Sequence, residues 1–326
     1  MRAWITGATG FLGGALARAL AAEGAEVHAL RRSARADGRP DLPVAWHEGD
    51  VTDVRSVRAF LDPAAAGDLV VHAAGRLGEA GVPEDVYRAV NVEGTRNVLA
   101  AAHACRSRPR VVHLSSPGVL GPSRAPARED APARPTNAYE RSKAAAEDVA
   151  RAFARAGLPV VLARPGFIYG PGDRHVLGLF RAVQRGRFFL VDGGRSLCQP
   201  TFVEDAVAGI LACLRNGAPG EAYHLCGSEA VSFRRLGEVI ADALAVAPPR
   251  LDLPRWPVLL GALALEALGR AGRFRPPLSR TGVAFFSEDR VVSCERAARE
   301  LGWVPSRGLR EGVERSVAWY RERGWL

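Results

Sequence analysis

The sequence predicts an α/β fold in which helices cover both faces of a doubly wound parallel sheet. Short apolar runs alternate with helical stretches six times before Pro165, and such alternation favours right-handed β-α-β units. The run over 68–75 is almost continuously apolar, as expected of a strand buried on both faces. Ligands of such sheets bind at the carboxyl ends of the strands, so we expect functional residues directly after the strands.

Glycine and proline mark where several elements end or begin. The first helix is expected to close at Gly24, because glycine adopts the left-handed conformation without strain. Pro83 is expected to open a long helix, where its missing N–H costs no hydrogen bond. We expect strands at 2–7, 25–32, 44–50, 68–75, 110–116 and 158–165, and helices at 11–24, 53–62, 83–105 and 137–157.

Composition and charge exclude several classes of function. The formal net charge is +9, but the arginines are dispersed among apolar segments without interleaved aromatic side chains, which argues against nucleic-acid binding. The five cysteines show no C-x-x-C pair or metal-ligand spacing, so we expect free thiols, no bound metal and a cytoplasmic location. No signal peptide fits the N-terminus. The apolar stretch 257–270 is too short to span a bilayer; we expect an amphipathic helix, with a membrane surface or an apolar ligand as candidate contacts.

A glycine motif follows the first expected strand and opens the first helix. It reads TGATGFLG, or T-G-x-x-G-x-x-G, at residues 6–13. Its glycines permit a tight turn, close approach of a pyrophosphate and close helix packing, while the helix N-terminus stabilises the anion. A plain glycine turn is the alternative, but the strand–turn–helix context favours a dinucleotide. The residues of the motif expected to bind it are Gly7, Thr9, Gly10, Phe11, Leu12 and Gly13.

Arg31 and Arg32 end the second expected strand, at the position where a carboxylate would bind the ribose hydroxyls of NAD. A guanidinium suits a 2′-phosphate instead, through opposite charge and paired donors. We therefore expect NADP(H) to be favoured, with NAD(H) as the alternative, since arginine is abundant throughout the chain.

Small and acidic residues follow the third and fourth strands. Asp50 is placed to meet the adenine amino group, with Val51 against the ring. Ala73, Ala74 and Gly75 leave room for a cofactor after the fourth strand, although small residues also end buried strands for packing reasons.

The pattern loosens after Pro165 and predicts a second region. Residues 1–165 are interpreted as a dinucleotide-binding domain and residues 166–326 mainly as a substrate-binding region. Segments near 201–228 are expected to return to the sheet, with a helix at 201–216 and a strand at 221–227. A further helix is expected at 231–246, whereas residues 250–293 have weak periodicity.

The only lysine of the chain, Lys143, lies four residues after Tyr139, so both share one face of an expected helix. An adjacent ammonium is expected to lower the phenol pKa from about 10, as general acid–base catalysis requires. The ammonium is also expected to bind the nicotinamide ribose, a task for which the planar guanidinium of arginine is not equivalent. An ordinary surface pair is the alternative, and the uniqueness of Lys143 disfavours it.

Two further polar residues are candidates beside this pair. Ser116 ends the fifth strand and is expected to donate a hydrogen bond to a reacting oxygen. Ser115 competes with it, but its side chain is expected on the opposite face of the strand. Asn91 lies within an expected helix and either organises a relay water near Lys143 or serves helix packing.

Taken together, these residues resemble the short-chain dehydrogenase/reductase superfamily in its extended branch. The resemblance is carried by TGATGFLG, GDV, HAAG, NVEGT, LSS, Y-x-x-x-K and RPGFIYGPGD, which ends at Asp173. It implies a Rossmann fold, a Ser116–Tyr139–Lys143 catalytic group and Pro165 near the nicotinamide. It also suggests a homodimer formed through the helices near residues 83–105 and 137–157.

Two groups of that superfamily compete. Nucleotide-sugar epimerases and dehydratases usually carry an arginine before an FVxVxD segment, where this chain has Gln199 and Pro200, with Arg195 as the nearest substitute. The segments 201–207 and 275–320 are similar to the 3β-hydroxysteroid dehydrogenase-like group, which includes reductases of long-chain β-keto acids. The stretch Leu253–Leu278 is expected to wall an apolar pocket.

The sequence therefore predicts an NAD(P)-dependent oxidoreductase that interconverts a secondary alcohol and a ketone on a hydrophobic, steroid-like or long-chain β-keto substrate. A nucleotide-sugar epimerase or dehydratase with tightly bound NAD is the alternative.

Overall fold

The chain folds around a parallel sheet with the strand order of a doubly wound α/β protein. The computed structural model describes residues 1–33, 42–272 and 278–326. Within these residues seven parallel strands pair in the order β12-β7-β5-β4-β1-β2-β3, which confirms the predicted fold class. The strands are β1 (Arg2–Thr6), β2 (Glu26–Arg31), β3 (Ala45–Glu48), β4 (Leu69–His72), β5 (Arg110–Leu114), β7 (Val160–Pro165) and β12 (Ala222–Leu225).

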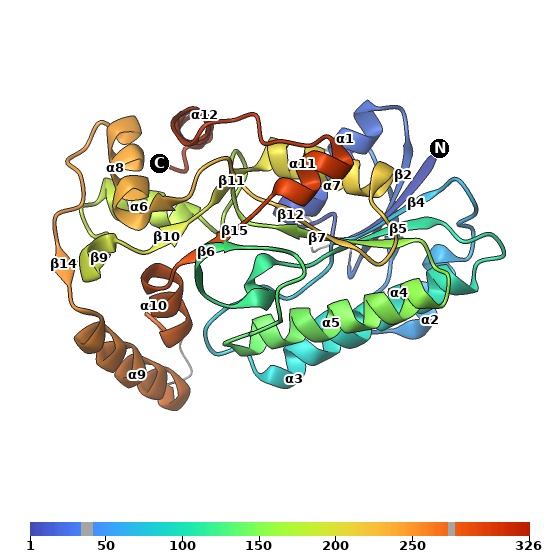
Figure 1. The fold of residues 1–326 in the computed structure, drawn as a ribbon, viewed down its shortest axis with the longest axis horizontal. Coiled ribbons are helices and arrows are strands. Elements are labelled where there is room, and N and C mark those ends of the chain that lie inside the picture. Colours follow the sequence, from blue (N-terminus) through green and yellow to red (C-terminus); the bar gives the residue numbers. More distant parts are fainter. Residues whose placement is uncertain (34–41, 273–277) are drawn as a thin grey trace.

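Helices cover both faces of this sheet (Figure 1). The first face carries α1 (Phe11–Ala22), α7 (Val203–Asn216) and α11 (Glu295–Leu301), and the second carries α2 (Val54–Leu61), α4 (Gly94–Ala104) and α5 (Ala138–Arg155). On β4, the side chains of Val70 and Val71 point to opposite faces of the sheet. Val71 packs in the core with α1 and α7, Val70 packs in the core with α2 and α4, and both are fully buried. The apolar run in β4 is therefore explained by burial on two sides.

The single helix expected over 83–105 is interrupted by a π-helical turn. A short helix, α3 (Glu84–Tyr87), leads into the π turn η2 (Arg88–Glu93), and α4 follows. Asn91 lies in this turn and is buried, and its side chain is bonded to the loop after β4 and to α5. Single π turns are frequent at functional sites. The contacts that hold this one come from residues distant in sequence, so helical periodicity does not predict it.

A second apolar core lies beyond the carboxyl ends of the strands, on the left of Figure 1. It is rich in rings, which meet edge to face; Phe180 and Tyr320, for example, have centroids 5.4 Å apart. The strand expected over 221–227 is β12 and joins the main sheet beside β7. The other elements of this part are β8 (Phe167–Tyr169), β11 (Pro200–Phe202), β10 (Leu197–Cys198), β13 (Val231–Ser232), α6 (Leu177–Gln184), η4 (Asp192–Gly194), α8 (Phe233–Leu244) and α12 (Leu309–Glu322).

The segment 250–293, whose periodicity is weak, contains two helices: the first projects from the body of the protein (Figure 1), and the second packs Phe285 and Phe286 against the ring-rich core. The first helix is exposed along much of its length, so apolar residues occur on both of its sides and blur the pattern. Residues 273–277, which fall in the stretch expected to wall a pocket, lie outside the described chain. The elements here are β14 (Asp252–Leu253), which pairs with β9 (Leu190–Val191), then α9 (Arg255–Gly272), α10 (Arg280–Ser287) and β15 (Arg290–Val292), which pairs with β6 (Ser123–Ala127).

Two expectations from composition can be compared with the structure. All five cysteines are free thiols. In the part of the chain that is described, the helices fall short of the length and apolar character that a bilayer-spanning segment requires.

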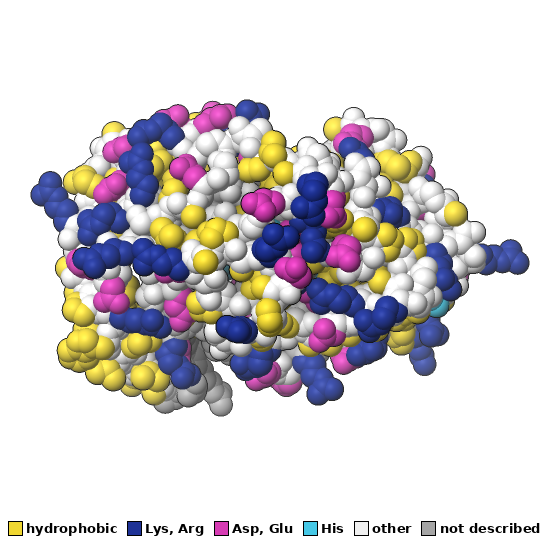
Figure 2. Space-filling view, in the orientation of Figure 1, with side chains coloured by type: hydrophobic (Ala, Val, Ile, Leu, Met, Phe, Trp, Pro, Cys, Tyr) yellow, Lys and Arg dark blue, Asp and Glu magenta, His cyan; other side chains and the backbone are white. Residues whose placement is uncertain are grey.

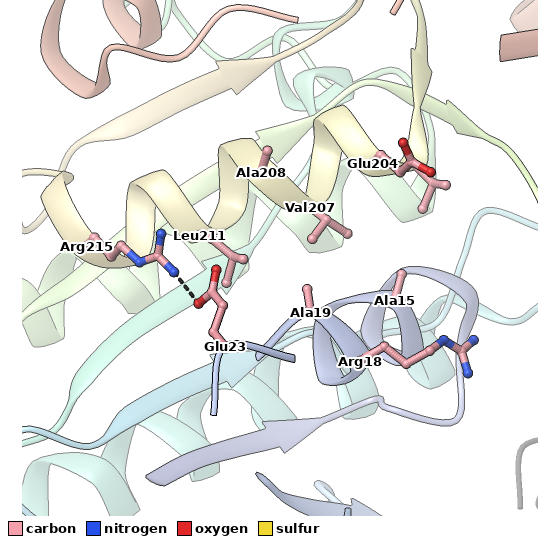
Figure 3. Close-up of a pocket in the computed structure, with 10 residues that line it drawn as sticks. Ala15, Arg18, Ala19, Glu23, Glu204, Val207, Ala208, Leu211 and Arg215 are labelled. Carbon is pink, nitrogen blue, oxygen red and sulfur yellow. Dashed lines mark hydrogen bonds and ion pairs between the residues drawn. The ribbon is translucent and has the colours of Figure 1, made fainter. Parts of the chain in front are cut away.

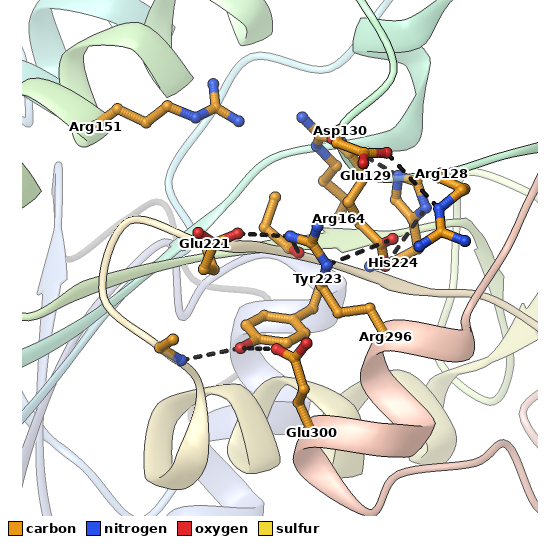
Figure 4. A network of polar contacts seen from close by, with 12 residues as sticks. Arg128, Glu129, Asp130, Arg151, Arg164, Glu221, Tyr223, His224, Arg296 and Glu300 are labelled. Atoms are coloured by element: carbon orange, nitrogen blue, oxygen red, sulfur yellow. Dashed lines mark hydrogen bonds and ion pairs between the residues drawn. The ribbon is translucent and has the colours of Figure 1, made fainter.

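A buried ionic network ties β7, β12 and α5 together, and Figure 4 shows the part of it around Arg164 and His224. Arg164 on β7 donates two 2.7 Å hydrogen bonds to the carboxylate of Glu147 on α5, and both side chains are at most 3% exposed. Arg164 also donates to the Glu129 carbonyl (3.1 Å) and to His224 Nε2 (3.3 Å). Because a guanidinium only donates, Nε2 accepts and Nδ1 donates to Ser293 O. Burial, followed by Arg164, lowers the pKa of His224 to about 3, so this imidazole is neutral.

This network predicts a large and specific loss of stability. Replacing Arg164→Leu removes two of the hydrogen bonds to the buried Glu147 carboxylate and leaves it only the half-buried Arg151 as a cationic partner (3.0 Å), so we expect a loss of about 3–5 kcal/mol in the free energy of unfolding. Arg141→Leu is the matched control, because its pair with Glu84 is exposed to solvent and is expected to contribute little to stability. Urea unfolding followed by circular dichroism measures both. Equal losses in the two variants, or no recovery in Arg164→Leu/Glu147→Leu, would contradict the assignment.

Candidate active site

The carboxyl ends of the parallel strands gather the expected site residues at one edge of the sheet. Each follows or ends a different strand, so residues distant in sequence become neighbours. Gly7 follows β1, Arg31 ends β2, Asp50 follows β3, Ala73 follows β4, Ser116 follows β5 and Pro165 ends β7.

The glycine motif forms a cradle that side chains would fill. Gly7 has φ +82°, and a Cβ there would lie 2.6 Å from the backbone of Ala73 and Ala74. A Cβ on Gly13 would overlap the Gly7 carbonyl group. The N-cap of α1 is Gly10, and within the described chain no side chain caps this helix end. Its backbone N–H groups are thus available to an anion, so the motif fits the pyrophosphate of a dinucleotide. Thr9, Phe11 and Leu12 are partly buried between these glycines.

The residues expected near the adenosine end lie around β2 and β3. The Arg31 guanidinium lies over the Trp46 ring, 5.2 Å from its centroid, and Arg32 is exposed. Asp50 Oδ1 accepts 2.8 Å hydrogen bonds from both the backbone and the hydroxyl of Thr52, so this carboxylate stabilises its own turn.

Small residues after β4 make room beside the helices that follow. At the start of α4, Gly94 leaves room for Val51, which follows β3 and is buried there; a Cβ on Gly94 would lie 3.0 Å from the valine side chain. A Cβ on Gly75 would lie 3.3 Å from Asn91 Oδ1 and 3.4 Å from Lys143 Nζ. Gly75 therefore leaves open the space that these two polar atoms border.

Tyr139 and Lys143 lie one turn apart near the start of α5. Asn137 caps this helix by accepting a 3.0 Å hydrogen bond from Glu140 N. Lys143 is only 7% exposed, and its ammonium donates a 2.7 Å hydrogen bond to the carbonyl oxygen of Leu114 at the end of β5. The helix is thus anchored by its lysine to the strand that leads to Ser116.

Ser116 lies beside the phenol, and Ser115 does not. The Ser116 hydroxyl is near enough to the phenol of Tyr139 to lower its pKa, and it accepts a hydrogen bond from Gly118 N (3.1 Å). Ser115 is buried, and its hydroxyl influences the pKa of Glu147 rather than that of Tyr139. Opposite strand faces account for this difference between two adjacent serines.

The expected lowering of the Tyr139 pKa is wrong for this structure. Burial raises the pKa of Tyr139 to about 12; the hydrogen bond from Ser116 opposes this effect, and Glu140 and Tyr87 add to it. One N–H of the Lys143 ammonium donates to Leu114 O, and Lys143 is not among the groups that shift the pKa of the phenol. The phenol is therefore neutral and carries a proton at physiological pH.

Burial also changes the basic groups around the phenol. It lowers the pKa of Lys143 to about 8, although the Glu147 carboxylate works in the opposite direction. His72 lies between Thr6 Oγ1 (2.8 Å) and Thr95 Oγ1 (3.0 Å), and burial, with Lys143, lowers its pKa to about 3. Lys143 is thus the group in this cluster that titrates closest to neutral pH.

Asn91 holds the loop after β4 and the backbone of Tyr139. Its Oδ1 accepts from Arg76 N (2.7 Å), and its Nδ2 donates to Arg76 O (3.1 Å) and to Ser142 Oγ (2.8 Å). Ser142 in turn donates to the Tyr139 carbonyl oxygen (2.7 Å). Both amide hydrogens are used in this way, which favours the packing interpretation of Asn91 over a water relay.

An ion pair beside Tyr139 has no counterpart among the sequence expectations. Glu140 is 4% exposed and accepts a 2.6 Å hydrogen bond from Arg290 on β15, and its other oxygen accepts from Thr136. Gln199, which lies in the stretch where nucleotide-sugar enzymes usually carry an arginine, accepts through Oε1 from Val292 N (2.7 Å) and so holds β15. Arg195 is exposed. Because arginine is abundant in the chain, nothing in the sequence singles out Arg290.

A groove of about 530 Å³ lies elsewhere, between α1 and α7 on one face of the sheet (Figure 3). Its floor is formed by small apolar side chains such as Ala15, Ala19 and Val207, and an ion pair between Glu23 and Arg215 closes one end. It is not at the edge where the strands end. The convergent polar groups expected of a catalytic site are around Tyr139, not in this groove.

Comparisons with known proteins agree with this geometry. A family model described as "NAD dependent epimerase/dehydratase family" matches residues 3–226. The chain is 31% identical to 4-hydroxy-2-methyl-3-oxo-4-farnesyl-3,4-dihydroquinoline-1-oxide ketoreductase from Stigmatella aurantiaca, over 96% of this chain and 95% of that protein. It is 32% identical to 2-alkyl-3-oxoalkanoate reductase from Stenotrophomonas maltophilia, over 98% and 99%. Among solved structures it is similar to a dTDP-glucose 4,6-dehydratase from Streptomyces venezuelae with NAD and TYD bound, with TM-score 0.81, 27% identity, and 100% and 99% coverage.

Proposed function

The chain belongs to the NAD dependent epimerase/dehydratase family, and on that premise we propose that it is an NAD(P)-dependent reductase of a ketone on a hydrophobic substrate. The observation that carries this proposal is the neutral phenol of Tyr139, which lies beside Ser116 and one helical turn from a buried ammonium. A proton donor of this kind is what an alkoxide, formed from a ketone, requires.

The residues of the chain have distinct roles in the proposed reaction. When bound, the nicotinamide supplies the hydride that forms the new C–H bond at the carbonyl carbon. Ser116 donates a hydrogen bond to the ketone oxygen, and Tyr139 transfers its proton to that oxygen, forming the alcohol. The Lys143 ammonium stabilises the negative charge left on the phenolate. The resting protonation state of Tyr139 is the one that reduction uses.

Two observations support an apolar substrate. The ketoreductase from Stigmatella aurantiaca and the reductase from Stenotrophomonas maltophilia carry "farnesyl" and "alkyl" in their names. In this chain Phe167, two residues after Pro165, meets the ring of Phe285 on α10 with centroids 5.2 Å apart. Aromatic side chains next to the strand ends favour hydrocarbon over a sugar nucleotide. We also propose a homodimer, which light scattering of the purified chain tests, and a cytoplasmic location, which fractionation of cells tests.

Turnover tests the proposal directly. With NADPH or NADH, a panel of long-chain β-keto acids and ketosteroids is expected to show loss of nicotinamide absorbance.

Tyr139→Phe removes the proton donor and is expected to lower kcat by about 10²–10⁴-fold. The rate of reduction is expected to fall as pH rises through about 8, because Lys143 then loses its charge. The Lys143→Met variant is expected to reduce the substrate slowly, and its rate is expected not to decrease as the pH rises through about 8.

Several outcomes would contradict the proposal. Wild-type turnover in Tyr139→Phe would remove the phenol from the chemistry. The dehydratase or epimerase alternative, which the similar solved structure represents, predicts three different results. NAD would be tightly retained and released only on denaturation, a sugar nucleotide would be turned over, and no ketone of the panel would be reduced.

The cofactor is proposed to be NADP(H), held at its 2′-phosphate by Arg31 and Arg32. Arg31→Ala is expected to weaken NADPH binding by about 1.5–3 kcal/mol, the contribution of a charge-assisted hydrogen bond, and to leave NADH binding unchanged. Fluorescence titration measures both dissociation constants, and Arg55→Ala serves as a surface control. Equal effects on the two cofactors would overturn the assignment.

A further inference from the structure

The long helix α9 carries an exposed apolar stripe, formed by Trp256, Leu260, Leu263, Ala264, Ala267 and Leu268. Four of these side chains are large, and they are 68%, 57%, 44% and 59% exposed for Trp256, Leu260, Leu263 and Leu268. The spacing of three and four residues places all six on one side of the helix. Figure 2 shows hydrophobic side chains gathered over α9 at the lower left of the molecule.

The opposite side of the same helix is already used for packing. Val258 and Ala262 are buried in a small core with Val191 on β9 and Val283 on α10. The helix is therefore held in place by one face while the stripe faces outward. Exposed apolar patches of this kind mark contacts with another body.

Charges around the stripe point to an anionic partner. Arg255 pairs with Glu288 and Arg280 pairs with Glu266, and in both pairs the guanidinium is the more exposed group, at 40% against 19% and 55% against 14%. Arg250 is exposed on the approach to the helix. Asp192 and Asp252 are also exposed, but each carboxylate accepts a backbone hydrogen bond, Asp192 from Arg255 N (2.9 Å) and Asp252 from Gly193 N (2.7 Å). The chain as a whole carries a formal net charge of +9.

A second copy of the chain is disfavoured by the same charges. A two-fold interface through the stripe would pair two antiparallel copies of α9 and bring Arg250 and Arg255 of one copy toward Arg280 of the other, and like charges across an interface are unfavourable. A helix with Trp and Leu on one side and arginines at its border has instead the composition of helices that lie in the plane of a membrane interface. We propose that the apolar stripe of α9 inserts into the surface of a bilayer that contains anionic phospholipid.

A chain of ion pairs connects this surface to the candidate active site. Glu288 links Arg255, the first residue of α9, to Arg290 (3.1 and 3.2 Å), and Arg290 binds Glu140 next to Tyr139 (2.6 Å). The helix on the bilayer and the start of α5 are thus held in a fixed relation. If the substrate is apolar, which rests on the proposed function, the bilayer is its reservoir.

Vesicle binding by the full chain, without substrate or cofactor, tests the docking surface separately from catalysis. The chain is expected to sediment with phosphatidylglycerol vesicles, more weakly at high salt and with phosphatidylcholine. Leu260→Asp/Leu268→Asp is expected to lower the partition coefficient at least about tenfold, as two buried side chains are lost from the interface. Val304→Asp, at an apolar residue that is 64% exposed elsewhere, is expected to bind as the wild type does.

The variants are expected to fold, because the replaced side chains are exposed. Circular dichroism and urea unfolding check that they do. Absence of binding to phosphatidylglycerol vesicles, or equal binding by the double variant, would overturn the proposal. So would a wild-type dimer that the double variant dissociates, because the stripe would then be a self-association surface. Failure of the ketone panel leaves these results unaffected.

Discussion

The hydrogen bond from the Lys143 ammonium to the carbonyl oxygen of Leu114 is the contact on which the candidate site depends. It joins the first turns of α5 to the end of β5, so that Tyr139 lies beside Ser116. The lysine is buried, and its charge is retained in the interior because the strand carbonyl accepts a hydrogen bond from the ammonium. An arginine, with a planar group and five donors, would not fit this narrow position in the same way.

Burial sets the protonation states around this contact. It raises the pKa of the phenol from 10.0 to about 12 and lowers the pKa of the ammonium from 10.5 to about 8, so the two pKa values move apart. The site therefore contains the neutral phenol of Tyr139 next to the Lys143 ammonium, which loses its charge only in mildly alkaline solution. This arrangement supplies a proton to a developing alkoxide and then stabilises the phenolate. The same desolvation keeps His72 neutral, so that it serves as a hydrogen-bonding link between Thr6 and Thr95.

The sequence was sufficient for the features that depend on local pattern. Alternating apolar runs predicted the sheet, TGATGFLG predicted the turn before α1, and the spacing of Tyr139 and Lys143 predicted their shared helix face. It did not predict what tertiary contacts decide: the π turn around Asn91, held by Arg76 and Ser142, or the pairing of Arg290 with Glu140. The direction of the phenol pKa shift was also missed, because spacing reveals a neighbouring charge but not the burial that outweighs it.

The most direct test of the neutral, buried phenol is its own titration. Carbon-13 NMR of the chain labelled at the ζ-carbon of its five tyrosines, with the Tyr139 signal assigned by its absence in Tyr139→Phe, follows this group alone. The account predicts a midpoint well above the ordinary value of 10.0, near 12. A midpoint below 10.0 would show that the ammonium, not burial, governs the phenol, and would contradict the account.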